Sequence, residues 1–224
     1  MTAYFIAGTD TDVGKTLVSC ALLLRASQAG IANVGLKPVA AGCEQTADGL
    51  RNEDALAMMA SMSEPLSYEQ VNPVALALPV APHIAAQQAN AILDLDSLVT
   101  HCRSYCEAFP FVIIEGAGGW RMPLNSPYFL SDLAVSLELP VILVVGLRLG
   151  CLNHAQLTLE AIHSDGLHLA GWVANQIQPD LLYPDANLAT LTELMGVPPL
   201  SILPYQPQVK SDDIAALFDC KTLF

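Results

Sequence analysis

The stretch GTDTDVGKT at positions 8–16 carries the residue types that bind a nucleotide phosphate. It ends in Gly14, Lys15 and Thr16, and the residues after them read as an amphipathic helix. Backbone N–H groups at such a helix start bind phosphate, a lysine reaches the β- and γ-phosphates, and a hydroxyl binds Mg²⁺. The spacing is unusual, because five residues separate Gly8 from Gly14. A chance Gly-Lys-Thr at a helix start is the alternative, but the apolar run before it favours a phosphate-binding loop.

Two acidic residues in other loops could hold the metal ion that accompanies a nucleotide. Glu115 ends the apolar part of FVIIEGAGG, residues 111–119, and the small residues after it let the backbone approach phosphate. We expect Glu115 to hold Mg²⁺ directly or through water. Asp54 lies in RNEDA, residues 51–55, where a helix is expected to begin. Asp54 can cap that helix or contribute to the metal site, and the sequence supports both roles equally.

Lys37 and Asn175 each end a predicted buried strand. A lysine in that place needs an anionic partner, which phosphate in the neighbouring loop would provide, unless the side chain extends to solvent. Asn175, in GWVANQIQ, can pair with an adenine edge through its amide, or it can be an ordinary satisfied strand-end residue. Guanine-specific sites usually add an Asp three residues on, where this chain has Gln178. The pattern therefore favours adenine.

The elements that position these residues are apolar runs alternating with helical stretches. Most of the runs are continuous, as in parallel strands covered on both faces. The predicted strands are 4–8, 33–39, 111–115, 141–146, 169–175 and 200–203, and the predicted helices are 16–29, 54–60, 95–108, 131–137, 152–164 and 186–195. The repeated β-α-β order predicts an α/β fold of three layers, with a doubly wound, mainly parallel sheet like that of P-loop NTPases. We expect residues 63–82 to form one long irregular excursion near the site.

Composition narrows the classes of partner. The 224 residues suit a single domain over 1–224, and the formal net charge of −13 would repel a nucleic-acid backbone. The chain has no uncharged apolar run of the roughly 18–20 residues that span a bilayer. Its first residues carry no basic region and run directly into an apolar strand, unlike a signal peptide. We therefore expect a cytoplasmic protein that binds neither nucleic acid nor membrane.

Eight stretches in register resemble the dethiobiotin synthetase family over nearly the whole chain. They are GTDTDVGKT, GLKPVAAG, GLRNEDA, APHIAA, EGAGGW, LPVILVVG, LGCLNHA and LAGWVAN. The resemblance implies an ATP-dependent cyclo-ligase that converts 7,8-diaminopelargonate and CO₂ into dethiobiotin, ADP and phosphate. It also implies Mg²⁺ and a homodimer in which the segment LGCLNHA serves the site of the other subunit.

The resemblance also implies a role for each matching residue. The catalytic residues would be Thr11, Asp12, Lys15 and Lys37. The nucleotide would contact Asp12, Val13, Gly14, Lys15, Thr16, Leu17, Asp54, Glu115, Gly116, Ala117, Gly118, Asn175, Gln176, Pro204, Tyr205 and Gln206. Mg²⁺ would lie among Thr16, Asp54 and Glu115, and the diamine would contact Ala41, Gly150, Cys151, Leu152 and Asn153.

Two positions depart from the family pattern. Ala41 stands where the family commonly has serine, so a hydroxyl donor to the substrate is lost or replaced. Asp12 stands where glutamate is more common, which keeps the charge on a shorter side chain. A cationic diamine explains why a phosphate loop carries an acid: Asp12 can attract an ammonium or accept its proton, while Lys15 and Lys37 stabilise carbamate and phosphate oxygens.

Two other classes compete with the ligase. Partner-switched ATPases of the partition or septum-positioning type share a P-loop on a parallel sheet, but typically add a lysine early in the loop, where this chain has Thr9-Asp10-Thr11. Many also end in a basic amphipathic helix, and the C-terminal DDIAALFDCKTLF is not basic. The other class is a module that binds nucleotide without turning it over. Phosphate release that requires both diamine and bicarbonate would distinguish the ligase from both.

Overall fold

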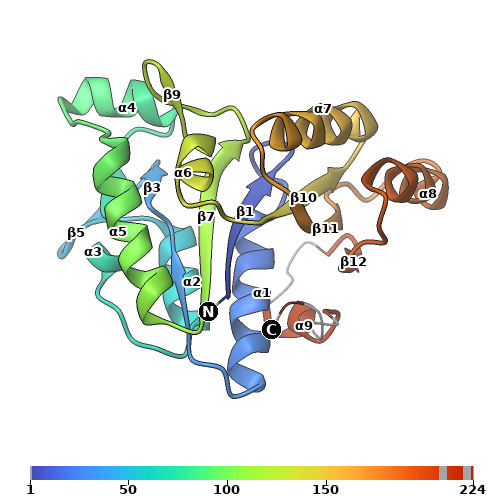
Figure 1. The fold of residues 1–224 in the computed structure, drawn as a ribbon, viewed down its shortest axis with the longest axis horizontal. Coiled ribbons are helices and arrows are strands. Elements are labelled where there is room, and N and C mark those ends of the chain that lie inside the picture. Colours follow the sequence, from blue (N-terminus) through green and yellow to red (C-terminus); the bar gives the residue numbers. More distant parts are fainter. Residues whose placement is uncertain (1, 207–210, 219–222, 224) are drawn as a thin grey trace.

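The computed structural model describes residues 2–206, 211–218 and 223, and within them a six-stranded sheet forms the centre of the molecule (Figure 1). The strand order is β12-β11-β10-β1-β7-β2, and all neighbouring pairs are parallel. The strands are β1 (Thr2–Gly8), β2 (Asn33–Leu36), β7 (Phe111–Gly119), β10 (Val141–Leu147), β11 (Leu169–Gln176) and β12 (Ser201–Leu203). The chain runs from β1 to one edge, returns, and then builds the other half, which is the doubly wound order predicted.

Helices cover both faces of this sheet and give the three predicted layers. The helices α1 (Lys15–Gln28), α2 (Glu53–Ser61) and α9 (Ser211–Ala215) pack on one face. The other face carries α5 (Leu95–Ala108), α6 (Ser131–Ser136), α7 (Cys151–Ser164) and α8 (Pro184–Met195). The neighbouring pairs α1 with α9 and α7 with α8 are visible in Figure 1. No helix within the described ranges is long and apolar enough to cross a membrane.

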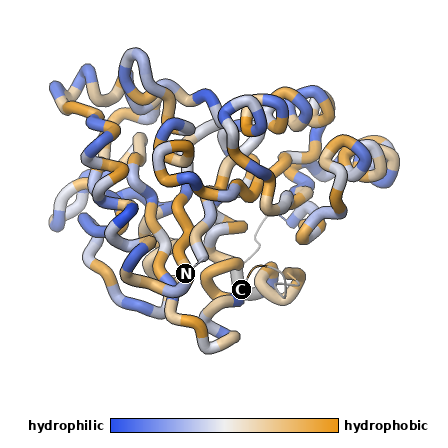
Figure 2. Tube along the Cα trace, viewed as in Figure 1, coloured by the Kyte–Doolittle hydropathy of each residue, from blue (hydrophilic) through white to orange (hydrophobic). Residues whose placement is uncertain are grey.

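Continuous apolar strands follow from this double cover. Along β1, Phe5 and Ala7 join the core on the α5 and α7 face, while Tyr4 and Ile6 join the core under α1. Every residue of β10 is buried. In Figure 2 the central strands are mostly hydrophobic, whereas the outer helices alternate between hydrophobic and hydrophilic residues. The apolar runs in the sequence are thus continuous because both rows of side chains along each strand are buried.

The predicted strand 33–39 is divided between two sheets. The strand β2 ends at Leu36, and β3 (Val39–Ala41) pairs in parallel with β6 (Val74–Leu76) in a separate two-stranded sheet. Pro38 lies at the change of sheet, where its missing N–H removes no ladder bond. Lys37 therefore leaves the main sheet just beyond its carboxyl edge, where ligands of this fold class bind.

The segment 63–82 is more regular than predicted. It contains α3 (Tyr68–Val71) and β6, and α4 (Pro82–Ala89) begins at its end. A capping box between Ser67 and Gln70 fixes the start of α3. Two antiparallel hairpins complete the described structure: β4 (Glu44–Thr46) with β5 (Gly49–Arg51), and β8 (Pro123–Asn125) with β9 (Tyr128–Phe129).

Candidate active site

The loop from β1 to α1 ends at Gly14, the N-cap residue of α1. Gly14 has a φ of 94°, a left-handed backbone conformation that favours glycine. A Cβ at this position would also collide with the side-chain amide nitrogen of Asn175. That nitrogen donates a hydrogen bond to the Val13 carbonyl at 2.8 Å. The end of β11 therefore fixes the loop where α1 begins.

Lys15 is buried at the start of α1, and its ammonium donates to the Asp10 carbonyl at 3.1 Å. Burial lowers the pKa of Lys15, and the nearby positive charge of Lys37 lowers it further. A phosphate beside Lys15 would favour its charged form. Asp10 also pairs with Arg148, and a hydrogen bond from the Thr11 N–H is the main cause that lowers the pKa of Asp10.

Glu115 is the centre of a hydrogen-bonded cluster under the loop, and only 1% of its surface is exposed. Its Oε1 accepts from the Thr16 hydroxyl at 2.8 Å and from the Lys37 ammonium at 2.6 Å. Its Oε2 lies 2.7 Å from the Ser19 hydroxyl oxygen, which also lies 3.0 Å from the Lys15 carbonyl. Residues of β7, α1 and the end of β2 thus meet at one carboxylate.

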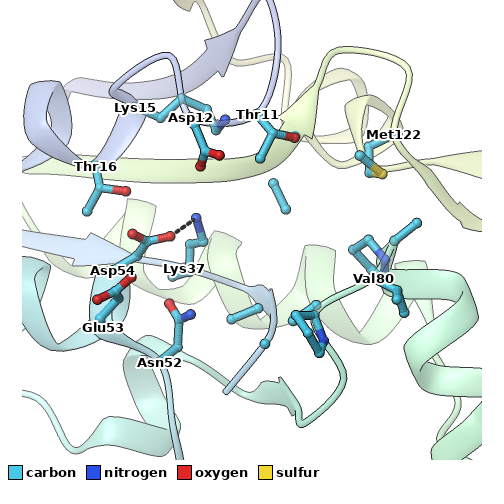
Figure 3. A pocket seen from close by; sticks show the side chains of 18 of the residues that line it. Thr11, Asp12, Lys15, Thr16, Lys37, Asn52, Glu53, Asp54, Val80 and Met122 are labelled. Atoms are coloured by element: carbon cyan, nitrogen blue, oxygen red, sulfur yellow. Dashed lines mark hydrogen bonds and ion pairs between the residues drawn. The ribbon is translucent and has the colours of Figure 1, made fainter. Parts of the chain in front are cut away.

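Lys37 joins this cluster to α2. Its ammonium donates to Asp54 Oδ2 at 2.9 Å, as Figure 3 shows, and to the Gly116 carbonyl at 3.3 Å. Burial lowers the pKa of Lys37, but the carboxylates of Glu115 and Asp54 outweigh burial and raise it overall. Partial burial raises the pKa of Asp54, but Lys37 and the Thr16 hydroxyl together lower it below its usual value. The shifts of Lys37 and Asp54 thus both favour the ionised form.

The structure excludes one of the two roles considered for Asp54. The N-cap residue of α2 is Asn52, whose side chain accepts from the Ala55 N–H at 3.2 Å. The capping role for Asp54 is therefore wrong, because Asp54 lies inside the first turn. Lys37 is buried and pairs with carboxylates of its own chain. The alternative prediction, that its side chain extends to solvent, is therefore wrong.

The residues named for Mg²⁺ fit that ion by their chemistry. Thr16, Asp54 and Glu115 offer a hydroxyl and two carboxylates, which are the hard oxygen donors that Mg²⁺ prefers. Thr16 and Lys37 already bring these oxygens together, since Lys37 contacts both carboxylates. A divalent cation could therefore replace or supplement the ammonium among these groups without a change of fold.

A cavity of about 790 Å³ opens above this cluster (Figure 3). Its polar side comes from the loop and α2, and Asp12 points into it from a left-handed conformation with φ 56°. Its apolar side comes from β3, β7 and the segment before α4. The lining residues are Thr11, Asp12, Gly14, Lys15, Thr16, Lys37, Ala40, Ala41, Gly42, Asn52, Glu53, Asp54, Pro79, Val80, Ala81, Pro82, Ala117, Gly118 and Met122.

Residues predicted for the adenosine lie together beside the loop rather than in this cavity. Asn175 is paired with Leu203 in the register of β11 and β12, so residues 204–206 continue next to residues 175 and 176. The Asn175 amide already donates to the loop, while Gln176 donates to the Gln178 carbonyl at 3.0 Å. Asn175 therefore has a structural role whether or not it also contacts a base.

The four residues predicted to bind the diamine at the start of α7, positions 150–153, do not line the cavity within the described chain. Gly150 is the N-cap of α7 with φ 94°, and Leu149 before it is 99% exposed. Arg148 ties this turn to the loop through its ion pair with Asp10. At this helix start Gly150 and Asn153 are exposed, whereas Cys151 is buried and Leu152 is half-buried, and all four lie outside the cavity of their own chain.

Sequence reasoning missed several residues that build the site. Ser19 lies one helical turn after Lys15, where a polar residue within an apolar helix could have signalled contact with a buried partner. In the apolar wall of the cavity, Ala81 and Pro82 begin the APHIAA stretch but received no site role, and Pro79, Val80 and Met122 lie outside the eight stretches. A third group lies behind Lys37: Asn72 donates to the Lys37 carbonyl, and Tyr68 donates to the Asn72 side chain.

The fold and the loop together define a P-loop nucleotide-binding protein of the three-layer α/β class. A family model described as an AAA domain matches residues 2–213. Among solved structures, a chain of the MinC:MinD cell division protein complex of Aquifex aeolicus matches with a TM-score of 0.60 at 15% identity, over 96% of this chain and 85% of that one. MinD complexed with Mg-ADP from Pyrococcus horikoshii matches with a TM-score of 0.57 at 16% identity, over 98% and 88%. At these identities the likeness concerns the fold alone.

Curated relatives at higher identity decide the family. The ATP-dependent dethiobiotin synthetase of Cellvibrio japonicus is 51% identical over 99% of this chain and 97% of its own length. That of Chromohalobacter salexigens is 53% identical over 91% and 90%, and that of Pseudomonas aeruginosa is 48% identical over 100% and 98%. The chain belongs to the ATP-dependent dethiobiotin synthetase family. This confirms the predicted family and an ATP-dependent cyclo-ligase as its class of enzyme.

Proposed function

We propose that this chain, acting as a single domain, forms dethiobiotin from 7,8-diaminopelargonate, CO₂ and ATP in biotin biosynthesis. The observation that carries the proposal is one cavity that combines a phosphate loop, two lysines and the carboxylate of Asp12. Opposite charges are needed side by side because the diamine can be cationic while ATP and a carbamate are anionic. Relatives of this name match over nearly their full length.

The first step is carboxylation of one amine. The amine nitrogen forms a bond to the carbon of CO₂, and a proton leaves the nitrogen. Asp12, exposed to the cavity, is the group that attracts the ammonium and accepts a proton at its carboxylate. The product is a carbamate, whose negative oxygens are stabilised by Lys37 at the cavity floor.

The second and third steps use the phosphate loop. A carbamate oxygen attacks the γ-phosphorus, the bond to the β–γ bridging oxygen breaks, and ADP leaves with a carbamic-phosphoric anhydride as the other product. Lys15 and the loop N–H groups hold the phosphate oxygens as their charge shifts. The second amine then attacks the carbamoyl carbon, phosphate leaves with the C–O bond pair, and loss of a proton completes the five-membered urea.

Thr16, Asp54 and Glu115 are the residues that would hold Mg²⁺, which supplies positive charge to the phosphate oxygens when bound. Ser19 orients the Glu115 carboxylate from below. The adenosine would lie along Asn175, Gln176 and residues 204–206, beyond the loop that Asn175 fixes.

The diamine would extend from Asp12 along the apolar wall of Val80, Ala81 and Met122. Ala41 lines the same cavity but has no hydroxyl to donate, so water or another group would contact the substrate there. We further propose a cytoplasmic homodimer. In it, residues 150–153 at the start of α7 of one subunit bind the carboxylate of the substrate that lies in the cavity of the other subunit. The position of that helix start outside its own cavity supports a shared site.

Mass spectrometry of the product tests the function. Purified protein is incubated with ATP, Mg²⁺, the diamine and ¹³C-bicarbonate, and the expected product is dethiobiotin that carries the label in its urea carbon. Omission of the diamine or of bicarbonate should stop both product formation and phosphate release. Phosphate release without the diamine, and with no labelled product, would instead support a switch ATPase.

A further inference from the structure

The chain behind Lys37 is held by a polar network that the proposed reaction steps do not use. Asn72, 2% exposed, donates from its amide to the Lys37 carbonyl at 2.6 Å and to the Val74 carbonyl at 3.2 Å. Its side-chain oxygen accepts from the Tyr68 hydroxyl at 2.9 Å. The Lys37 N–H donates in turn to the Val71 carbonyl at 2.9 Å. The backbone of Lys37 is thus bonded on both sides to the segment 71–72.

The network continues into the helix that carries Asp54. The Tyr68 hydroxyl, besides donating to Asn72, accepts from the Asn52 N–H at 2.7 Å. Asn52 is the N-cap of α2, and Asp54 follows it in the first turn. The Tyr68 ring is buried against Ala55 of α2, with the Arg51 guanidinium 4.1 Å from the ring centroid on its outer side.

These contacts close a ring. It runs from the Lys37 carbonyl through the Asn72 amide and the Tyr68 hydroxyl to the start of α2, and returns through the 2.9 Å ion pair between Asp54 and the Lys37 ammonium. The site needs such support because Lys37 has left the main sheet: β2 ends at Leu36. Side chains whose neighbours are fully hydrogen-bonded keep one position, and catalysis depends on that position at the scale of 1 Å.

We propose that Tyr68 and Asn72 are positioning residues that set Lys37 against Asp54 and Glu115, and so aim the ammonium at the reacting oxygens. The proposal rests on the proposed function for its catalytic consequence. Neither residue lines the cavity within the described chain, so their action passes through Lys37. A single hydroxyl, that of Tyr68, links the two halves of the ring.

Tyr68→Phe removes that hydroxyl and keeps the aromatic side chain. We expect kcat to fall about tenfold, while the KM for ATP stays within about twofold, because Lys15 and the loop are untouched. The matched control is Tyr4→Phe. Tyr4 lies in the N-terminal half of β1, and the substitution removes a buried hydroxyl that donates to the Leu223 carbonyl at 3.3 Å. Tyr4→Phe should leave kcat unchanged, and circular dichroism should show both variants folded.

A double-mutant cycle separates positioning from a general structural effect. On a Lys37→Met background, Tyr68→Phe should change the residual kcat by less than about twofold, because its effect requires the ammonium. A full tenfold loss on that background would overturn the proposal, since Tyr68 would then act elsewhere. A Tyr68→Phe enzyme with the kcat of wild type would overturn it as well.

Hydrogen exchange at the Lys37 ammonium gives a readout that does not depend on turnover. In ¹⁵N spectra the signal of the buried ammonium, identified by its loss in Lys37→Met, should exchange with water faster in Tyr68→Phe and not in Tyr4→Phe. Equal exchange in wild type and Tyr68→Phe would refute the positioning role. A wild-type protein that forms no dethiobiotin would refute the proposed function instead, and the exchange rates would still decide the role of Tyr68.

Discussion

Replacement of Lys37 by methionine keeps the length of the side chain but removes the charge that two carboxylates share. Glu115 is 1% exposed and would keep the Thr16 and Ser19 hydroxyls as partners in the described chain. To leave a buried charge without its counter-charge costs roughly 3–5 kcal/mol. With an unfolding entropy of about 2.1 cal/mol/K per residue, a chain of this size should lose about 6–11 °C in Tm.

Calorimetry in a buffer with a chelator measures this loss, and a second substitution tests its cause. Glu115→Gln added to Lys37→Met neutralises the stranded carboxylate, so the double variant should recover most of the lost Tm. Addition of Mg²⁺ should raise the Tm of Lys37→Met more than that of wild type, because the ion replaces the missing charge. Turnover of Lys37→Met should fall about a hundredfold, equivalent to roughly 3 kcal/mol of transition-state stabilisation.

The difference in Tm between wild type and Lys37→Met should depend on pH, and the direction of the Lys37 pKa shift predicts how. Burial lowers the pKa of Lys37, but the two carboxylates raise it above the ordinary value of 10.5. The ion-pair contribution is therefore complete below pH 10.5 and is lost as the pH rises through the raised folded-state value. The Tm difference between wild type and variant should shrink in that alkaline range, and again at acid pH as Asp54 loses its charge through its lowered folded-state pKa. A variant as stable as wild type without metal, or a double variant that recovers nothing, would refute this account of the cluster.

Three further substitutions test other parts of the site. Asp12→Asn should weaken binding of the diamine more than of ATP in separate calorimetric titrations, and the reverse order would remove Asp12 from the ammonium side. Asn175→Ala should raise the KM for ATP several-fold with little change in kcat, since it releases the Val13 carbonyl and loosens the loop. Asn153→Asp places a charge in the first turn of α7, which favours the helix but repels an anionic ligand. Asn153→Asp alone should therefore have little activity, as Lys37→Met has. Subunit exchange between the two variants should restore at most about a quarter of wild-type activity; no recovery despite exchange would place both groups in one subunit.

The main sheet could be predicted because its signal is strong and local. Double cover makes its central strands continuous apolar runs, and β10 is buried along its whole length. The small elements gave no comparable signal: β3 and β6 have three residues each, and α3 has four. At that length neither periodicity nor apolar content separates a strand from a loop. The pattern SYEQ at 67–70 is nonetheless a capping-box signature that would have located α3.

Some residues that line the cavity could be named from the sequence, but the contacts between them could not. Lys37 and Glu115 stood out because charged residues at the ends of buried strands are rare. That they pair with each other depends on the register of β2 and β7, which sequence alone does not fix. Asp54 offered two roles, and only the geometry of α2 shows that Asn52 is the cap. The contacts of Ser19 with Glu115 and of Asn72 with Lys37 join ordinary polar residues that lie far apart in the sequence, so no local pattern predicts these pairs.

The cavity has walls of two separate origins, and this bears on how such an enzyme can diversify. In the proposed reaction the phosphate groups would be bound by loops of the six-stranded sheet, while Ala41 and residues 79–82 belong to the two-stranded sheet of β3 and β6 and its continuation. Backbone hydrogen bonds from Gly42 to Leu78 and from Cys43 to Leu76 keep that second wall together as a unit. Under the proposed function, substitutions at Ala41 or Val80 would alter the length or polarity of the accepted chain and leave the phosphate loop unchanged. Directed evolution toward homologous diamines would begin on this wall.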